Sequence, residues 1–329
     1  MGDKPQKTSM VKTAAFMAIL TLFSKLIGFV RELVMANYYG AGLINDSYVM
    51  AENIPNYLLA ALISAVGAAY MPTFSRKYEL EGEASANRFT SALLNMLVLV
   101  SSVIILFGEI FAGGIVKLFA PGFSAEGMAL TTVFLRMMFF VTLLGIFITI
   151  LGAYLQYKEC FLPQIIFGYV QSLSIIAVII ISVHTTYYIL PLGLIIGYLL
   201  RSVFSVGLAK KHGFVYSKVL DFGPTVREIA VLALPVFIGG YVNQINGFID
   251  KMLASNLAEG SVSALNYGLL VVNVIAELSV TVIATIAYPK FNQAVALQQY
   301  DRLSSNSESA INLSAIITVP FTFGAFIYS

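Results

Sequence analysis

The sequence predicts an all-α polytopic membrane protein, and three observations carry this prediction. Hydrophobic residues make up 58% of the 329 residues and charged residues only 11%, whereas a soluble domain has about 45–50% and about 25%. The mean hydropathy is +0.85. Nine apolar stretches are long enough to cross a bilayer, which takes about 20 helical residues. Lipid is therefore part of the solvent, which excludes a soluble enzyme, a nucleic-acid binder and a secreted scaffold.

Charge and cysteine content exclude further kinds of partner and site. The 19 basic and 17 acidic residues give a net charge of +2, so we expect no nucleic acid or other anionic polymer as partner. Cys160 is the one cysteine, and His184 and His212 are the two histidines, too few for a disulfide framework or for a thiolate or histidine metal site. No catalytic motif is present, so we expect no enzymatic activity, no metal and no cofactor.

All nine stretches should be helices, because backbone groups in hydrocarbon must be satisfied within their own segment. Short loops with turn formers such as Gly40-Ala41-Gly42 and Pro121-Gly122 separate them. In chain order the stretches cover approximately residues 10–36, 46–74, 88–112, 128–155, 161–182, 186–209, 226–253, 262–288 and 308–329.

Basic residues in alternate loops predict a cytoplasmic N-terminus in the cell membrane, because cytoplasmic loops are enriched in lysine and arginine. With that orientation the outer loops contain only Lys117. A signal peptide is the rival interpretation of the first stretch, but the stretch is too long and lacks a small-residue cleavage site. The inner set is Lys4, Lys7, Lys12, Arg76, Lys77, Arg88, Lys158, Lys210, Lys211, Lys218, Arg227, Lys290 and Arg302.

The longest polar connection, Lys210–Arg227, predicts a boundary between two lobes. We expect a six-helix lobe over residues 1–222 and the first three helices of a second lobe over residues 223–329. The segment Ala36–Gly42 after the first helix resembles Ala254–Gly260 after the seventh, as in a parallel six-helix repeat. The final stretch stops within an apolar run, so we expect a chain truncated in its ninth helix.

Ionisable side chains within the first helix indicate a functional site. A charge at a helix centre costs about 2.5–3.5 kcal/mol on insertion scales and needs a partner or a wet cavity. Lys25 and Glu32 are seven residues apart and share a face, and Arg31 lies about 100° from Glu32. Three ionisable groups within two turns exceed what packing requires.

Polar stripes on three more helices predict that all four face one hydrated cavity between the lobes. Amides that tie helices together and a structural Asp250–Lys251 bridge remain alternatives. Arg201, in the sixth helix, is expected to extend toward the cytoplasmic end of that helix. The stripes comprise Asp46, Glu52, Asn53 and Asn56 in the second helix, Asn243, Asn246, Asp250 and Lys251 in the seventh, and Asn266, Asn273 and Glu277 in the eighth.

Several motifs resemble the MurJ (MviN) family of lipid II flippases, within the multidrug/oligosaccharidyl-lipid/polysaccharide exporter superfamily. The strongest is Ser24-Lys25-Leu26-Ile27-Gly28-Phe29-Val30-Arg31-Glu32, and the sequence looks like a Gram-positive, clostridia-like member. Further motifs are Tyr39-Gly40-Ala41-Gly42, Asn45-Asp46-Ser47-Tyr48, Ile54-Pro55-Asn56, Ala120-Pro121-Gly122-Phe123, Asn243-Gln244-Ile245-Asn246 and Ile249-Asp250-Lys251.

The resemblance implies two six-helix lobes, a terminal helix pair and a cationic cavity that binds an undecaprenyl-pyrophosphate-linked precursor. Arg31 and Asp46 match residues of the family, and Lys25 stands in place of a second arginine, without its bidentate phosphate geometry. Basic residues of the family's second and eighth helices align near Leu59 and near Leu269 and Leu270. The predicted cavity therefore has fewer cations than the family's.

We therefore expect a monomeric transporter that flips lipid II from the cytoplasmic to the outer leaflet by alternating access. The resemblance also implies that Asp250 takes part in coupling to Na⁺, and membrane potential would supply about 2.3 kcal/mol per charge per 100 mV. The alternatives are a flippase for a capsule or teichoic precursor, a cation-coupled multidrug antiporter and a non-transporting scaffold. The expected substrate-binding residues are Lys25, Arg31, Glu32, Asp46, Glu52, Asn53, Asn56, Asn243, Asn246, Lys251, Asn266, Asn273 and Glu277.

Overall fold

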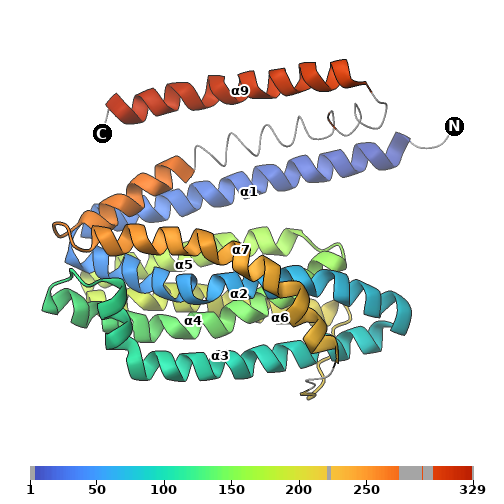
Figure 1. The fold of residues 1–329 in the computed structure, drawn as a ribbon, viewed down its shortest axis with the longest axis horizontal. Coiled ribbons are helices and arrows are strands. Elements are labelled where there is room, and N and C mark those ends of the chain that lie inside the picture. The colour runs from blue at the N-terminus through green and yellow to red at the C-terminus, as the bar shows by residue number, and fades with distance from the viewer. Residues whose placement is uncertain (1–3, 221–223, 274–290, 292–298, 328–329) are drawn as a thin grey trace. The chain divides into compact units, whose positions relative to one another are not determined.

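The fold was obtained as a computed structural model, which describes residues 4–220, 224–273, 291 and 299–327 (Figure 1). Every regular element in these ranges is helical, which confirms the all-α prediction. Residues 261–273 are the described part of a further helix. The elements are α1 (Lys4–Tyr39), α2 (Leu43–Glu81), α3 (Glu83–Phe119), α4 (Ala125–Tyr157), α5 (Leu162–His184), the 3₁₀ turn η1 (Tyr187–Ile189), α6 (Leu190–Lys211), α7 (Pro224–Ala254) and α9 (Tyr300–Ile327).

The first four predicted stretches and the seventh lie inside α1–α4 and α7, which extend two or more residues further at most ends, while the fifth and sixth stretches begin one residue before α5 and η1. The ninth stretch matches α9 up to residue 327, where the described part ends. The helix α2, for example, continues to Glu81, because a charged helix end needs no lipid around it. Of the predicted eighth stretch, only residues up to 273 are described. Within the described part, the helices Glu83–Phe119, Ala125–Tyr157, Ile165–His184 and Tyr187–Lys211 are long and apolar enough to cross a membrane.

The chain divides into two units, each of which packs on its own. The larger unit is Leu26–Leu265, and the smaller one combines Met1–Lys25 with Asn266–Ser329. The smaller unit includes the first part of α1, residues 266–273 and α9, which has Pro320 in its interior. The expected lobe boundary at residues 222 and 223 stays a prediction.

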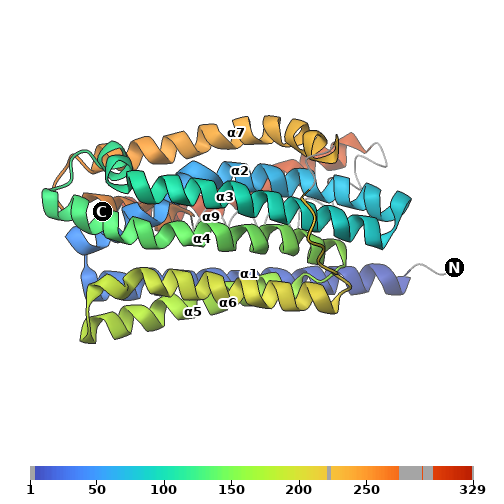
Figure 2. The same cartoon turned by 90° about the horizontal axis from the view of Figure 1, so that it is seen from below.

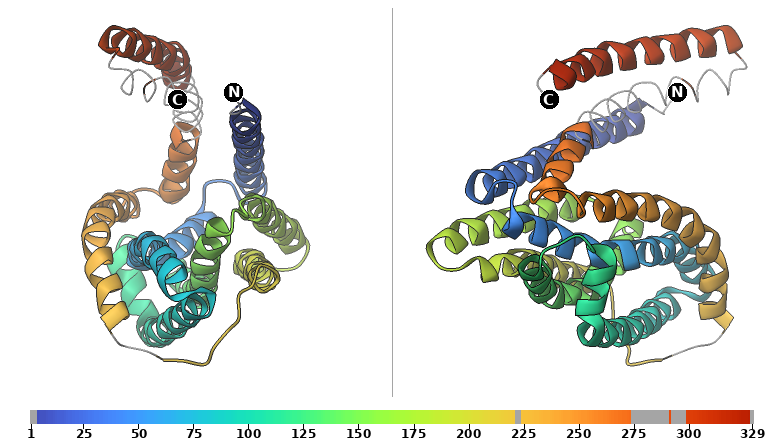
Figure 3. Two further views of the ribbon diagram at one scale, coloured as in Figure 1. Left: turned by 90° about the vertical axis from the view of Figure 1, so that its right-hand side faces the viewer. Right: turned by 60° about the vertical axis from the view of Figure 1, so that its left-hand side comes forward.

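Helix α2 is the centre of the larger unit. It packs against α3, α4 and α7, while α4 also contacts α3 and α6, and α5 packs on α6 (Figure 2). Seen nearly end-on in the left view of Figure 3, α3, α4 and α7 lie around α2. One apolar core includes the fully buried Ile54 and Phe139, and a second includes Tyr70 and Phe74.

Two glycines allow very close packing where the α1–α2, α3–α4 and α7–261 turns meet, which we name the α1–α2 end. A Cβ on Gly122 would lie 2.3 Å from the Ser255 carbonyl oxygen, so backbone meets backbone there. Gly260 has φ +91°, a conformation that favours glycine, and a Cβ on it would lie 2.6 Å from the Ala41 oxygen. The turn after α7 is thereby closed against the turns after α1 and α3.

At the opposite end, which we name the α2–α3 end, the chain turns at Gly82, between α4 and α5, and after α6. Gly82 (φ +86°) separates α2 from α3, and its backbone N–H donates to the Tyr78 carbonyl. The segment after α6 runs along α3, where Asn95 donates to the Val219 carbonyl at 2.9 Å. The polar connection after α6 is thus fixed to the bundle.

Candidate functional site

The central feature of the larger unit is a group of two cations and two acids from three helices, which we name the ionic cluster. It consists of Arg31 and Glu32 from α1, Glu52 from α2 and Lys251 from α7. The Glu52 carboxylate interacts electrostatically with all three others. The cluster has no net formal charge, and this balance lowers the cost of placing it inside the bundle.

Within the cluster, Arg31 and Glu32 form a direct ion pair. The Arg31 Nε donates to Glu32 Oε1 at 3.0 Å, and Nη2 donates to the same oxygen. The two side chains are 22% and 12% exposed. Lys251 is only 4% exposed, and it interacts electrostatically with both Glu52 and Glu32. The arginine is the more accessible cation.

The local sequence of α2 explains how Glu52 is positioned. Pro55 lies inside the helix and has no N–H to donate to the carbonyl four residues earlier. On either side of Pro55, Asn53 donates to the Val49 carbonyl at 2.7 Å and Asn56 to the Glu52 carbonyl at 3.1 Å. The two amides thus bond to their own helix around the proline, while Glu52, just before them, interacts with the cluster.

A cavity of about 320 Å³ adjoins the ionic cluster between α2, α4 and α6. Glu52 and Asn56 line it from α2, and Tyr198 and Arg201 line it from α6. The Arg201 Nη1 donates to Gln171 Oε1 of α5 at 3.1 Å. The expectation that Arg201 extends to the helix end is therefore wrong, because Gln171, in the middle of α5, holds the guanidinium inside the bundle.

Asp46 ties α2 to the start of the helix at 261–273. Its side chain is buried, with one oxygen accepting from the Gly260 N–H at 2.7 Å and the other from the Ser263 N–H at 2.7 Å and from the Ser263 hydroxyl. The first N–H groups of a helix have no partner within it and favour a negative charge. Nearby, Glu259 Oε1 accepts from the Leu43 N–H at 3.0 Å.

The seventh-helix candidates separate onto different surfaces. Asp250 and Asn246 are exposed, while Lys251 is buried. Asp250 lies within electrostatic range of Tyr57, whose hydroxyl donates to the Gly247 carbonyl at 2.9 Å. Asn243 lies in α7, and its side chain is outside the described residues. Among the residues that the structure describes, no group of three or more His, Cys, Asp or Glu gathers as a metal site.

The remaining candidates do not belong to the larger unit. Lys25, Asn266 and Asn273 are in the smaller unit, with Lys25 and Asn273 exposed. Glu277 lies outside the described residues. The structure therefore brings together four of the expected substrate-binding residues, which are Arg31, Glu32, Glu52 and Lys251.

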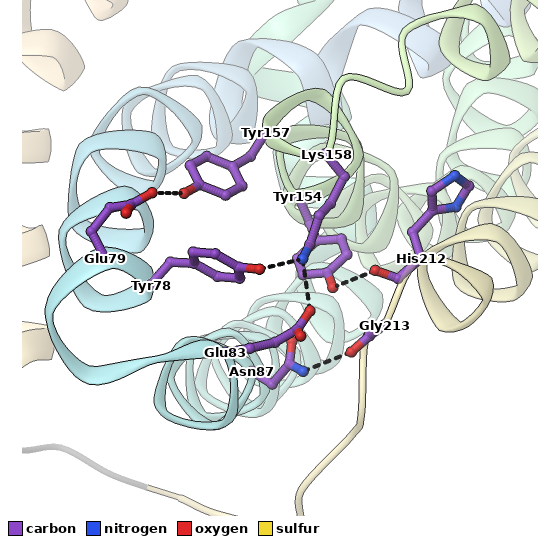
Figure 4. A network of polar contacts seen from close by, with 9 residues as sticks. All are labelled: Tyr78, Glu79, Glu83, Asn87, Tyr154, Tyr157, Lys158, His212 and Gly213. Carbon is purple, nitrogen blue, oxygen red and sulfur yellow. Dashed lines mark hydrogen bonds and ion pairs between the residues drawn. The ribbon is translucent and has the colours of Figure 1, made fainter.

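Sequence reasoning missed a polar network at the α2–α3 end, shown in Figure 4. Lys158 donates to Glu83 Oε1 at 2.7 Å and to the Tyr78 hydroxyl at 3.1 Å, and lies over the Tyr78 ring. Tyr154 donates to the His212 carbonyl at 3.2 Å, and Asn87 to the Gly213 carbonyl at 2.8 Å. Burial lowers the pKa of Lys158, but its bonds to Glu83 and Tyr78 outweigh this, and the pKa is raised.

Comparisons with known proteins identify the family. The model of the family described as lipid II flippase MurJ matches residues 35–329. A relative from Buchnera aphidicola subsp. Baizongia pistaciae, named probable lipid II flippase MurJ, is 27% identical over 98% of this chain and 67% of its own length. One from Treponema pallidum with the same name is 23% identical over 96% of this chain and 62% of its own. The chain thus spans about two thirds of the length of these relatives.

Solved structures show the same fold. A lipid II flippase MurJ in an inward closed conformation superposes with a TM-score of 0.80 at 21% identity, covering 93% of this chain and 64% of that one. A multidrug resistance MATE family transporter of the MOP superfamily, in an inward-facing conformation, gives 0.69 at 14% identity, over 92% of this chain and 72% of that one. Since the family model covers most of its length, the chain belongs to the lipid II flippase MurJ family.

Proposed function

We propose that the full-length protein flips lipid II across the cell membrane by alternating access. The observation that carries this proposal is the ionic cluster, in which Arg31 is the accessible cation inside a bundle of membrane-length helices. A pyrophosphate with a sugar head group cannot cross hydrocarbon unaided, whereas its polyprenyl tail can remain in lipid. Membership of the lipid II flippase MurJ family supports this substrate.

Arg31 is the residue that we assign to the substrate phosphates. A guanidinium presents a planar fork of donors that fits phosphate oxygens. In this structure Glu32 accepts two of its bonds, so the carboxylate holds the cation in place and lowers its cost in the membrane. An arriving phosphate would exchange with Glu32 for the same donors. Arg31 then has a negatively charged partner both before and after the substrate binds.

We assign the α1–α2 end to the outside of the membrane and the N-terminus to the cytoplasm. The basic residues Arg76, Lys77 and Lys158 lie near the α2–α3 end, as positively charged cytoplasmic loops require. The close backbone contacts of Gly122 and Gly260 are then contacts on the outer side. The state described is therefore one in which the outer side is closed within the larger unit.

The further assignments extend this proposal. The proposed substrate contacts also include Lys25, Asn53, Asn56, Asn243, Asn246, Asn266, Asn273 and Glu277. Asp46 ties α2 to the helix that begins at residue 261, and a contact of Asp46 with the substrate is a further proposal. We also propose that the protein is a monomer. Asp250, exposed on α7, is proposed to take part in Na⁺ coupling with oxygen ligands from other helices. Asp250→Asn should remove any sodium dependence of transport, and unchanged dependence would leave it a structural role.

The test of the proposed function is replacement of an essential lipid II flippase in living cells by the full-length protein. Rescue of viability, with accumulation of lipid II at the outer leaflet, is the expected result. Failure to rescue by a protein that is correctly inserted and expressed would contradict lipid II as the substrate.

A further inference from the structure

The cavity between α2, α4 and α6 has one acidic and one basic side chain in its wall. Glu52 and Arg201 both line it, together with the hydroxyl-bearing Thr142 and Thr149 of α4. Its volume of about 320 Å³ reaches the lower range of ligand pockets in proteins, about 300–1,000 Å³. The cavity is therefore large enough for a small polar group with water.

The two charges in the wall differ in how they are compensated. Glu52 interacts with the cations Arg31 and Lys251 of the ionic cluster. Arg201 has a neutral hydrogen-bond acceptor, Gln171, and its buried Nε has no hydrogen-bond partner among the described residues. No acid in the described part of the chain forms an ion pair with it. Arg201 is thus a partly buried cation whose donors are only partly used.

A buried cation of this kind is costly unless an anion or water compensates it. The guanidinium cannot lose its proton to relieve the cost, and its remaining donors suit an oxygen acid that accepts two bonds at once. The Thr142 and Thr149 hydroxyls can donate further bonds to the same group. The residues on this side of the cavity are those of an anion site.

We propose that Arg201 and the cavity beside it bind a carboxylate or phosphate group, as a second anion site in addition to Arg31. The group comes either from the acidic part of the transported head group, which rests on the proposed function, or from a free anion in solution. Glu52 links the site to the ionic cluster, since it lines the cavity and interacts with Arg31. Occupation of the two sites is therefore coupled.

The first arm of the test uses free anions and does not depend on transport. The melting temperature of the purified full-length protein is measured in acetate, in phosphate and in chloride at equal ionic strength. The second arm compares binding of lipid II with binding of lipid II whose carboxylates are methyl-esterified. Wild-type protein and Arg201→Gln are measured in both arms.

Arg136→Gln is the matched control, because Arg136 is an exposed helix arginine 3.9 Å from Glu109. Gly145→Leu is a second variant that keeps Arg201 but fills the cavity. A Cβ on Gly145 would meet Tyr198 at an ordinary 3.9 Å, so the larger side chain can enter the cavity without a backbone clash. This variant keeps the proposal testable if Arg201→Gln fails to fold.

A head-group site predicts that esterification weakens binding to wild type and to Arg136→Gln by about tenfold, with no effect on Arg201→Gln or Gly145→Leu. A free-anion site predicts that acetate or phosphate raises the melting temperature of wild type and Arg136→Gln, but not that of Arg201→Gln or Gly145→Leu. The proposal is overturned if neither esterification nor the anions distinguish wild type and Arg136→Gln from Arg201→Gln and Gly145→Leu. Failure of lipid II to bind wild-type protein would contradict the proposed function and leave the first arm to decide on Arg201.

Discussion

Lys251 of α7 interacts with Glu52 of α2 rather than with Asp250, its neighbour in the sequence. The lysine is 4% exposed and interacts electrostatically with Glu52 and Glu32, while Asp250 lies on the exposed side of the same helix. Adjacent helical residues point about 100° apart. Lys251 and Asp250 therefore lie on different surfaces of α7. The interaction of Lys251 with Glu52 holds α7 to α2 in addition to their packing.

Removing one charge of this pair should destabilise the protein more than removing both. Lys251→Met leaves the partly buried Glu32 and Glu52 with Arg31 alone, and breaking a fully buried pair costs about 3–5 kcal/mol, which sets the upper end of the expected loss. Adding Glu52→Gln should recover much of the lost melting temperature. Unfolding in detergent, followed for both variants with the exposed Lys117→Met as control, measures this. A double variant less stable than Lys251→Met would contradict the pairing.

Asp46 should contribute to stability as a cap for the helix that begins at residue 261. Asp46→Ala removes the acceptor for the Gly260 and Ser263 N–H groups, and loss of a cap costs about 0.5–2 kcal/mol. We expect a lower melting temperature with little change in the affinity for lipid II. Unchanged stability combined with weaker substrate binding would return Asp46 to the set of direct substrate contacts.

The α1–α2 end should open when glycine is lost from the turn after α3. In Gly122→Ala the new Cβ would meet Ser255 backbone at 2.3 Å, so the turn after α7 must move away. A cysteine introduced at the exposed Asn256, with Cys160 changed to serine, should then react faster with a membrane-impermeant thiol reagent. Gly113→Ala is the control, since nothing lies within 4 Å of a Cβ there. Equal reactivity in both variants would contradict closure by backbone contact.

The ion pair at the α2–α3 end should make stability depend on alkaline pH. The pKa of Lys158 is raised in the folded protein above its ordinary value of 10.5. The stability that this lysine contributes is therefore fully present below about pH 10.5 and is lost as the pH rises through the folded-state pKa. Wild-type protein should therefore lose more melting temperature than Lys158→Met as the pH rises above about 10.5. Parallel losses in the two proteins would show that the Lys158–Glu83 bond does not stabilise the fold.

The sequence predicts the helices of this protein well because apolar length and turn formers act locally. Arg31 and Glu32 could be recognised for a similar reason, since neighbouring charges in one span are visible in the sequence itself. The partner of Lys251 could not be predicted, because it depends on which face of α7 packs against α2. For Arg201, distance from the helix end suggested a surface position, and only the packing of α5 on α6 places Gln171 beside it.

The polar network around Lys158 had no local signal at all. Its members come from α2, α3, the end of α4 and the segment after α6 (Figure 4), and each on its own is an ordinary residue near a helix end. Asp46 was visible as an acid in a polar stripe, but its use as a helix cap requires the turn after α7 to meet the start of α2. Contacts between distant segments decide the role of both.

The most direct test of the account is the transport of lipid II by Arg31→Ala in the full-length protein. The measurement is the amount of lipid II that reaches the outer leaflet in cells depleted of their own flippase, with membrane insertion checked in parallel. Arg136→Ala, at an exposed arginine of α4, is the matched control. We predict that Arg31→Ala inserts normally and loses transport while Arg136→Ala retains it, and transport at the control level by Arg31→Ala would contradict the phosphate-binding role of Arg31.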